Sequence, residues 1–149
     1  MIILWLTAII IFLLDRFTKY LVKTNMEPGQ TIPVIQDFFH LTYIENSGAA
    51  FGILKNRTWP LILVTIVILV FLIYLAYTMA RNNKWLLVSL GLIIGGALGN
   101  LLDRIQTGLV VDFFDFRGIW SFIFNVADVG VVVGVIILAW RIILMEKQE

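Results

Sequence analysis

The chain of 149 residues contains no cysteine and a single histidine, His40. Without cysteine there is no disulfide, no thiolate nucleophile and no cysteine-ligated metal. One histidine cannot form a multi-histidine metal site, and a serine–histidine catalytic pair would depend on His40 alone. We interpret His40 as an interfacial residue and not as a ligand. The chemistry must therefore use carboxylates, amides, hydroxyl groups, Arg, Lys or the backbone, and we predict no cofactor and no metal.

Charged residues are also scarce. They make up 14% of the chain, the net charge is +1 and no basic run is present, so we expect no nucleic-acid partner. Hydrophobic residues make up 60%, and the mean hydropathy is +0.96. Soluble domains are about 45–50% apolar. The composition therefore indicates a membrane protein, and the length indicates a single integral membrane domain covering residues 1–149.

Four apolar segments are long enough to cross hydrocarbon as helices, which requires about 20 residues. We interpret the first as a retained span, because no basic residue precedes its apolar run and no clear cleavage site follows it. The third reaches the required length only narrowly. The four predicted spans cover about residues 2–22, 59–79, 85–102 and 122–145.

Two long connections join these segments. Residues 31–52 contain Pro33, the loosely alternating stretch "FFHLTYI" and a turn-like Gly/Asn/Ser run, which together indicate short β-strands on the membrane surface. Residues 105–121 are mixed and aromatic, which suits an interfacial segment. We therefore predict an all-α membrane protein with four transmembrane helices. A small β-rich segment lies between the first two helices, and an interfacial segment lies between the last two.

The order of four antiparallel spans gathers the acidic residues on one side of the membrane. Counting Lys and Arg gives seven on that side and four on the other. At face value the positive-inside rule would place the acidic side in the cytoplasm. Several of the seven lie within one helical turn of an aspartate, so the count does not decide the orientation. The acidic residues that share this side are Asp15, Glu45, Asp103, Asp112, Asp115 and Asp128.

Asp112 in "VVDFFDF" and Asp128 in "FNVADVG" are the candidate catalytic pair. A carboxylate near hydrocarbon costs several kcal/mol unless it is neutralised or hydrated. Two neighbouring carboxyls cannot both ionise easily, so one serves as a general base and the other as a general acid that together activate water. The alternatives are that Asp128 caps the fourth span and Asp112 is a solvated loop residue. From spacing alone, the loop interpretation of Asp112 is the better one, whereas the two interpretations of Asp128 are balanced.

The motif Asn-x-x-Asp occurs at Asn100–Asp103 and again at Asn125–Asp128. Residues three apart share a helix face, so each asparagine can orient its neighbouring carboxylate or donate to a substrate carbonyl. An equally good interpretation is that Asp103 and Arg104 form a polar helix end.

Other short patterns have simpler interpretations. Asp15 and Lys19 have the spacing of a helical ion pair. The small residues of the run "ENSGAAFG" would let a peptide backbone approach closely, or the run forms an ordinary turn. Glycines at four-residue steps predict close helix packing, at Gly91, Gly95 and Gly99 and again at Gly130 and Gly134.

Five motifs in order resemble those of the lipoprotein signal peptidases (signal peptidase II): "DRFTK", "YIENSGAAFG", "GGALGNLLDR", "GLVVDFFDF" and "FNVAD". The match covers all four predicted spans. Arg16 stands where many members have Gln, which does not affect the assignment. The resemblance implies that Asp112 and Asp128 are the catalytic dyad. It implies that the residues which support the site or bind substrate are Asp15, Lys19, Asn46, Gly48, Asn100, Asp103, Arg104 and Asn125.

The resemblance also implies the reaction and the location. Members are aspartic endopeptidases of the bacterial cytoplasmic membrane that cleave diacylglyceryl-modified prolipoproteins on the N-terminal side of the lipidated cysteine. Both termini would be cytoplasmic, residues 23–58 and 105–121 extracytoplasmic, and the active site would face outward. The implied partners are prolipoproteins and membrane lipid, with the chain acting as a monomer.

Two other classes of protein are consistent with parts of the pattern. A small proton-coupled transporter also uses intramembrane Asp and Arg, but here the charges cluster on one side and the far halves of the spans are almost bare. A scaffold that binds partner helices through its glycine faces leaves both aspartates and both asparagines of the repeated motif unexplained.

Overall fold

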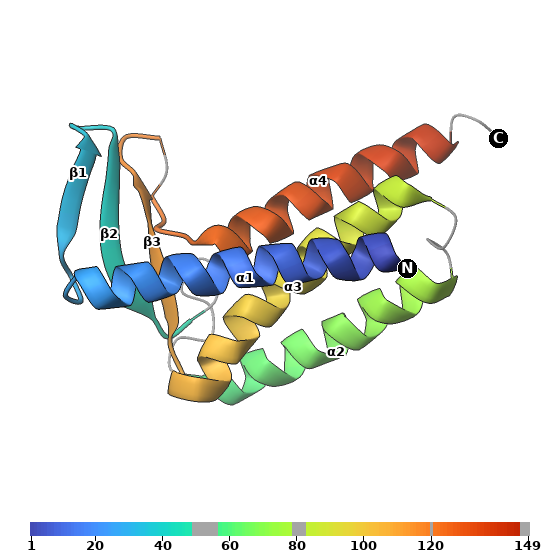
Figure 1. Cartoon of the computed structure of the whole chain (residues 1–149), viewed down its shortest axis with the longest axis horizontal. Coiled ribbons are helices and arrows are strands. Elements are labelled where there is room, and N and C mark those ends of the chain that lie inside the picture. Colours follow the sequence, from blue (N-terminus) through green and yellow to red (C-terminus); the bar gives the residue numbers. More distant parts are fainter. Residues whose placement is uncertain (49–56, 79–82, 120, 147–149) are drawn as a thin grey trace.

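The computed structural model describes residues 1–48, 57–78, 83–119 and 121–146. Within these residues, four helices run alongside one another and a small sheet lies at one end of them (Figure 1). The N-terminus and the end of the last helix lie at the opposite end (Figure 1). The elements are α1 Ile2–Asn25, β1 Thr31–Ile35, β2 Phe39–Asn46, α2 Thr58–Thr78, α3 Lys84–Thr107, β3 Val110–Phe116 and α4 Val126–Glu146.

In the part of the chain that the structure describes, three helices are long and apolar enough to cross a membrane. These are α2, α3 and the stretch Val126–Leu144 of α4. Helix α1 has 24 residues but carries Asp15, Arg16 and Lys19, and it is not one of the three. The predicted helical architecture is therefore confirmed, with three of the four predicted spans as candidate membrane-spanning helices, while the fourth span and the topology stay predictions.

The bounds of α3 and α4 differ from those predicted. Helix α3 continues five residues beyond the predicted end, to Thr107, and ends where Gly108 adopts a φ of +80°. The left-handed region favours glycine, which explains the stop. Helix α4 begins only at Val126, although the apolar run begins earlier. Between them, the predicted interfacial segment contains strand β3, which we did not predict.

The sheet joins the two long connections. Its strand order is β1-β2-β3, and both pairs are antiparallel. Ile44 pairs with Asp112, and Asn46 pairs with Val110, so the end of β2 lies beside the start of β3. The predicted strands within residues 31–52 are confirmed as β1 and β2, while residues 49–52 lie outside the described part of the chain. This pairing places Asn46 and Asp112, which are 66 positions apart in the chain, in direct contact.

Helix α3 packs closely against α1 and α4 through glycine. A Cβ at Gly91 would lie 2.6 Å from the carbonyl oxygen of Leu4, and one at Gly95 would overlap the backbone of Ala8. On α4, a Cβ at Gly134 would lie 2.7 Å from the carbonyl oxygen of Ser89. The predicted role of these glycines in helix packing is therefore confirmed. Close approach of backbones is the usual way in which membrane helices associate.

We expect Gly95→Ala to destabilise the protein by about 1–3 kcal/mol, since the added methyl group meets the backbone of Ala8 and the helices must separate. Gly130→Ala is the matched control. Its Cβ would meet the Cγ2 methyl of Ile11 at 2.9 Å and the carbonyl oxygen of Leu92 at 3.3 Å, so a smaller backbone shift relieves the contact than at Gly95. The measurement is the unfolding midpoint of both variants in detergent. Equal losses of stability would contradict the assigned packing contact.

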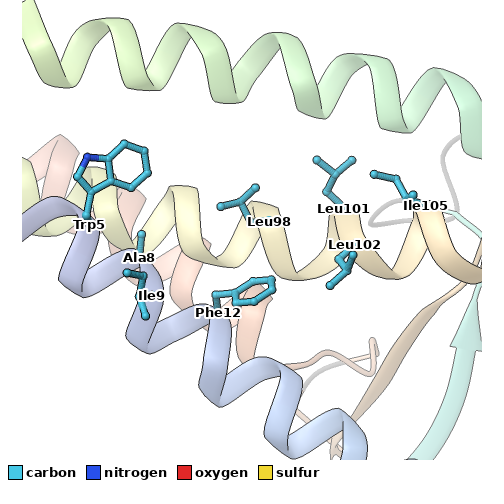
Figure 2. A pocket seen from close by; sticks show the side chains of 8 residues that line it. All are labelled: Trp5, Ala8, Ile9, Phe12, Leu98, Leu101, Leu102 and Ile105. Atoms are coloured by element: carbon cyan, nitrogen blue, oxygen red, sulfur yellow. The ribbon is translucent and has the colours of Figure 1, made fainter.

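An apolar groove lies between α1 and α3, and α2 runs alongside α3 above it in this view (Figure 2). Its volume is about 350 Å³. Ile105 also lines a second cavity of about 440 Å³, which contains Arg104 and the start of α2 at Thr58 and Trp59. The residues that line the groove are Trp5, Ala8, Ile9, Phe12, Leu98, Leu101, Leu102 and Ile105.

Candidate active site

Strand β3 holds Asp112 in the protein interior. Side chains alternate between the two faces of a strand. Val111 and Phe113, the neighbours of Asp112, are buried in an apolar cluster with Val22 of α1 and with Met26, which follows α1. Asp112 therefore points to the other face, where it is only 2% exposed. The interpretation of Asp112 as a solvated loop residue is wrong, because that interpretation did not include strand β3.

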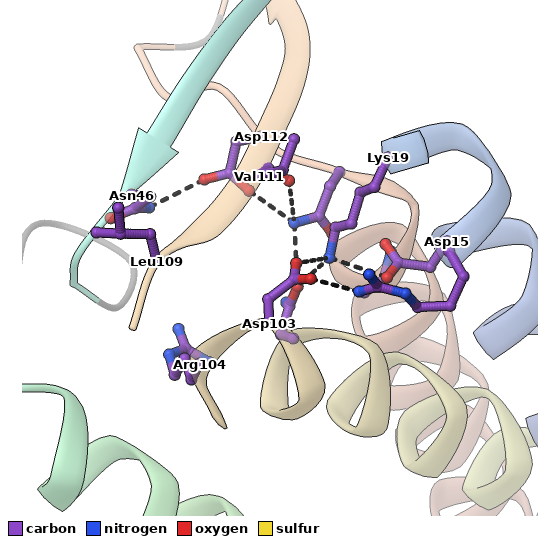
Figure 3. A network of polar contacts seen from close by, with 12 residues as sticks. Asp15, Lys19, Asn46, Asp103, Arg104, Leu109, Val111 and Asp112 are labelled. Atoms are coloured by element: carbon purple, nitrogen blue, oxygen red, sulfur yellow. Dashed lines mark hydrogen bonds and ion pairs between the residues drawn. The ribbon is translucent and has the colours of Figure 1, made fainter. Parts of the chain in front are cut away.

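Two amide groups hold the carboxylate of Asp112. Asn125 Nδ2 donates to its Oδ1 at 2.6 Å, and Asn46 Nδ2 donates to its Oδ2 at 3.0 Å (Figure 3). Burial raises the pKa of Asp112 to about 7, and the nearby carboxylate of Asp128 acts in the same direction. The two hydrogen bonds and the positive charge of Lys19 oppose this rise in pKa without cancelling it. Asp112 is thus an acid whose proton is exchangeable near neutral pH.

Asp128 lies in the first turn of α4. Asn125 Oδ1 accepts from the backbone N–H of Asp128 at 3.0 Å, and Asp128 Oδ2 accepts from the backbone N–H of Asn125 at 3.1 Å. This reciprocal pair is a capping box, which explains why α4 begins after Asn125. The predicted capping role of Asp128 is confirmed. Its other oxygen, Oδ1, accepts from Asn100 Nδ2 at 2.8 Å, so Asp128 also takes part in a contact between helices.

Asn125 connects the two aspartates. Its side-chain oxygen accepts from Asp128, while its side-chain nitrogen donates to Asp112 and lies 3.1 Å from Asn100 Oδ1. Asn125 holds the carboxylate of its neighbour Asp128 through its backbone N–H and not through its side chain as predicted, because the side-chain amide donates to Asp112 instead. For the other Asn-x-x-Asp motif the expectation is wrong, because Asn100 donates across to Asp128 and not to its own neighbour, Asp103.

A buried ion cluster lies beside this pair (Figure 3). The predicted pair of Lys19 with Asp15 is confirmed, with Nζ 2.9 Å from Oδ2. The same Nζ lies 2.8 Å from Asp103 Oδ2, and Arg16 forms an ion pair with Asp103 Oδ1. Asp103 is 3% exposed, so the interpretation of Asp103 as part of a polar helix end is wrong. Asp15 Oδ1 accepts from the backbone N–H of Ala127 at 3.1 Å, which ties α1 to α4.

Arg104 and Gly48 lie at the edge of the site. Arg104 Nη2 donates to the carbonyl oxygen of Gly48 at 3.1 Å. The backbone N–H of Gly48 donates to Asn46 Oδ1 at 2.9 Å, which fixes the amide that holds Asp112. The rest of the run "ENSGAAFG" after Gly48 lies outside the described residues. His40, predicted as interfacial, is 5% exposed within β2.

All of the predicted site residues thus fall in one connected region of the fold. One residue that we did not predict, Arg16, also takes part in the ion cluster. Its partner Asp103 is 87 positions away, so no local spacing reveals the pair. The available signal was the presence of a second cation in an otherwise apolar helix, beside Asp15.

Comparison with known proteins identifies the family. The family described as signal peptidase (SPase) II matches residues 7–144. The chain belongs to the signal peptidase II family. It is 45% identical to the lipoprotein signal peptidase of Moorella thermoacetica, with 97% of this chain and 95% of that relative aligned. It is 47% identical to the lipoprotein signal peptidase of Halothermothrix orenii, with 97% and 96% aligned.

Two solved structures share this fold. One, a bacterial membrane enzyme studied by the in meso method, superposes with a TM-score of 0.91 at 36% identity, over 97% of this chain and 89% of that one. The other, also described as a bacterial membrane enzyme, has a TM-score of 0.85 at 38% identity, over 92% and 90%. The predictions of a peptidase, of this family and of a membrane protein are confirmed.

Proposed function

We propose that this signal peptidase II removes the signal peptide from diacylglyceryl-modified prolipoproteins, cutting on the N-terminal side of the lipidated cysteine. The observation that carries the proposal is the connected pair Asp112 and Asp128. The two carboxyl groups come from different elements and are both held by Asn125, whose side-chain Nδ2 donates to Asp112 Oδ1 and whose backbone N–H donates to Asp128 Oδ2. Two neighbouring carboxyls, one ionised and one protonated, can activate water without a thiol or a histidine.

The proposed reaction uses both members of the pair. The ionised carboxylate accepts a proton from water as the oxygen attacks the scissile carbonyl carbon. The protonated carboxyl then donates its proton to the amide nitrogen as the C–N bond breaks, which releases an amine and a carboxylic acid. Every oxygen of the two carboxyls already accepts a hydrogen bond from an amide group. The second lone pair of each oxygen is what water or the substrate would use.

The proposal includes the position of the site in the membrane. We infer that α1 forms a fourth span, in which Arg16 and Lys19 are paired with Asp15 and with Asp103 of α3, and that both termini are cytoplasmic. The sheet and the dyad then face outward, near the outer surface of the cytoplasmic membrane. Figure 1 supports a common side for the N-terminus and the end of α4, opposite the sheet. A scissile bond anchored by a signal helix and by lipid lies at this depth, which explains why buried carboxylates are needed there.

Membrane lipid contributes to substrate binding in this proposal. The groove of about 350 Å³ between α1 and α3 offers an apolar surface for an acyl chain (Figure 2). Burial of each CH₂ group contributes about 0.8 kcal/mol. The sheet would form a partial cover over the site that excludes bulk water. A substrate with a photocrosslinker on its acyl chain should label this groove, and labelling confined to the end that holds the termini would refute this placement.

A cleavage assay tests the function. Purified monomeric protein in lipid-supplemented detergent is given a diacylglyceryl-modified prolipoprotein and, separately, the same prolipoprotein without lipid. We expect cleavage of the lipidated substrate to be faster by at least about tenfold, because only it gains the acyl-chain contacts. If neither substrate is cut, the proposed function fails, and proton flux across vesicles becomes the next measurement.

A further inference from the structure

Lys19 is a buried cation that makes no contact with Asp112 or Asp128. Its side chain is 1% exposed, and its Nζ lies within 2.9 Å of three acceptors: Asp15 Oδ2, Asp103 Oδ2 and Asn100 Oδ1. An ammonium group has three N–H donors and no acceptor, so these contacts use all of them. Two of the contacts neutralise Lys19. The third contact is with Asn100, which itself donates a hydrogen bond to Asp128.

The contact with Lys19 fixes the orientation of the Asn100 amide. Asn100 Oδ1 accepts from Lys19 at 2.8 Å and lies 3.1 Å from Asn125 Nδ2. A reversed amide would place an NH₂ group against both of these donors. The NH₂ of Asn100 must therefore point away from Lys19, and it donates to Asp128 Oδ1 at 2.8 Å. A hydrogen bond from an NH₂ group that cannot reverse favours the ionised form of Asp128.

The two aspartates differ in the groups that contact the donors of their hydrogen bonds. Asp128 accepts from Asn100, which a cation polarises, and from the backbone at the positive end of the α4 dipole. Asp112 accepts from Asn125 and Asn46, whose own oxygens are held by neutral backbone N–H groups. Asp128 is also partly exposed, whereas Asp112 is 2% exposed. All three differences favour the charge on Asp128.

We propose that Lys19, acting through Asn100, is a positioning residue that keeps Asp128 ionised, so that Asp128 is the general base and Asp112 the general acid. This inference rests on the proposed function of the dyad. It assigns the initial proton to Asp112, from which it passes to the leaving amine. Water gives its proton to Asp128 in the same turnover. The charged groups around Asp128 are Asp112 on β3, Arg104 and Asp103 on α3, and Asp15 and Lys19 on α1.

The sign of the effect follows from these charges. Lys19 and Arg104 favour a negative Asp128, while Asp112, Asp15 and Asp103 disfavour it. The charge of Lys19 also favours the ionised form of Asp112, so its preference for Asp128 comes from the hydrogen bond through Asn100. Removing Lys19 alone would also leave Asp15 buried without its cation, which endangers folding. The test therefore uses Asp15→Asn as the reference. In Asp15→Asn/Lys19→Met no acidic group loses its only cation, since Asp103 keeps its ion pair with Arg16.

The experiment is the pH dependence of kcat for cleavage of the lipidated prolipoprotein. Compared with Asp15→Asn, the variant Asp15→Asn/Lys19→Met should lose activity at low pH, with the acidic limb displaced upward by about one pH unit. The matched control is Asp15→Asn/Arg16→Gln, which removes a cation from the same cluster but none from Asn100. The acidic limb of this control should move by less than about a third of the displacement that Lys19→Met causes, since Arg16 contacts only Asp103 in the cluster.

A second comparison tests the route through Asn100. In an Asp15→Asn/Asn100→Leu background, the displacement caused by adding Lys19→Met should fall to less than half of that seen with Asn100 present. A lower kcat with an unmoved pH profile would make Lys19 a purely structural residue and overturn the inference. An equal displacement with and without Asn100 would show that Lys19 does not act on Asp128 through Asn100. If the unmodified protein cleaves nothing, the proposed function itself has failed, which is a separate result.

Discussion

Asp112→Asn and Asp128→Asn are each expected to lower kcat for cleavage of the lipidated prolipoprotein by at least about 10³-fold, since each removes one of the two groups that transfer protons. An asparagine has nearly the same shape as an aspartate but cannot accept or donate the proton. The asparagine oxygen can keep one of the two hydrogen bonds that each carboxylate accepts, while its NH₂ group meets a donor at the other position, so the unfolding midpoint of each variant is measured alongside kcat. Binding of the lipidated substrate should persist, and it is measured separately by co-purification.

Asp115→Asn is the matched control for this prediction. Asp115 lies on the same strand, three residues after Asp112, and its carboxylate accepts from Thr42 Oγ1 at 2.7 Å and pairs with Arg117 at 3.2 Å. It makes no contact with the dyad among the described residues. We expect Asp115→Asn to retain kcat within about threefold, as a substitution outside the reacting groups should. Retention of full activity by either dyad variant would refute the assignment of general acid and base.

Two substitutions at Asn125 should separate catalysis from helix capping. Asn125→Ser keeps a side-chain oxygen that can accept from the backbone N–H of Asp128, but it loses the amide that donates to Asp112 at 2.6 Å. Asn125→Ala loses both. We expect kcat to fall by about 10²-fold in both variants, because Asp112 loses the hydrogen bond that aligns it with Asp128. The free energy of unfolding should fall by about 1 kcal/mol more in Asn125→Ala than in Asn125→Ser.

The measurements are kcat with the lipidated substrate and the unfolding midpoint in detergent for the same preparations. The two variants share the catalytic defect and differ in stability, so each serves as the control for the other. A serine variant with the activity of the unmodified protein would show that Asn125 acts only as a helix cap. Equal stability of the two variants would show that the capping box contributes nothing measurable to α4.

The sequence by itself determined the class of the protein and much of its local order. The apolar runs give α2, α3 and α4, since a span of hydrocarbon needs about 20 residues of helix. The spacing of Lys19 after Asp15 gives their ion pair, and the glycine steps on α3 give its packing face. The five ordered motifs give the family. Each of these features depends on residues that are near one another in the chain.

The tertiary structure decided which of the predicted residues act together. Spacing within one helix paired Asn100 with Asp103, but the crossing of α3 with α4 pairs it with Asp128. The burial of Asp112 depends on β3, whose partner strand β2 precedes it by two helices in the sequence. The route from Lys19 to the dyad likewise crosses from α1 to α3 to α4. Local periodicity reports one helix or strand at a time, whereas contacts between distant segments arise only when packing brings them together.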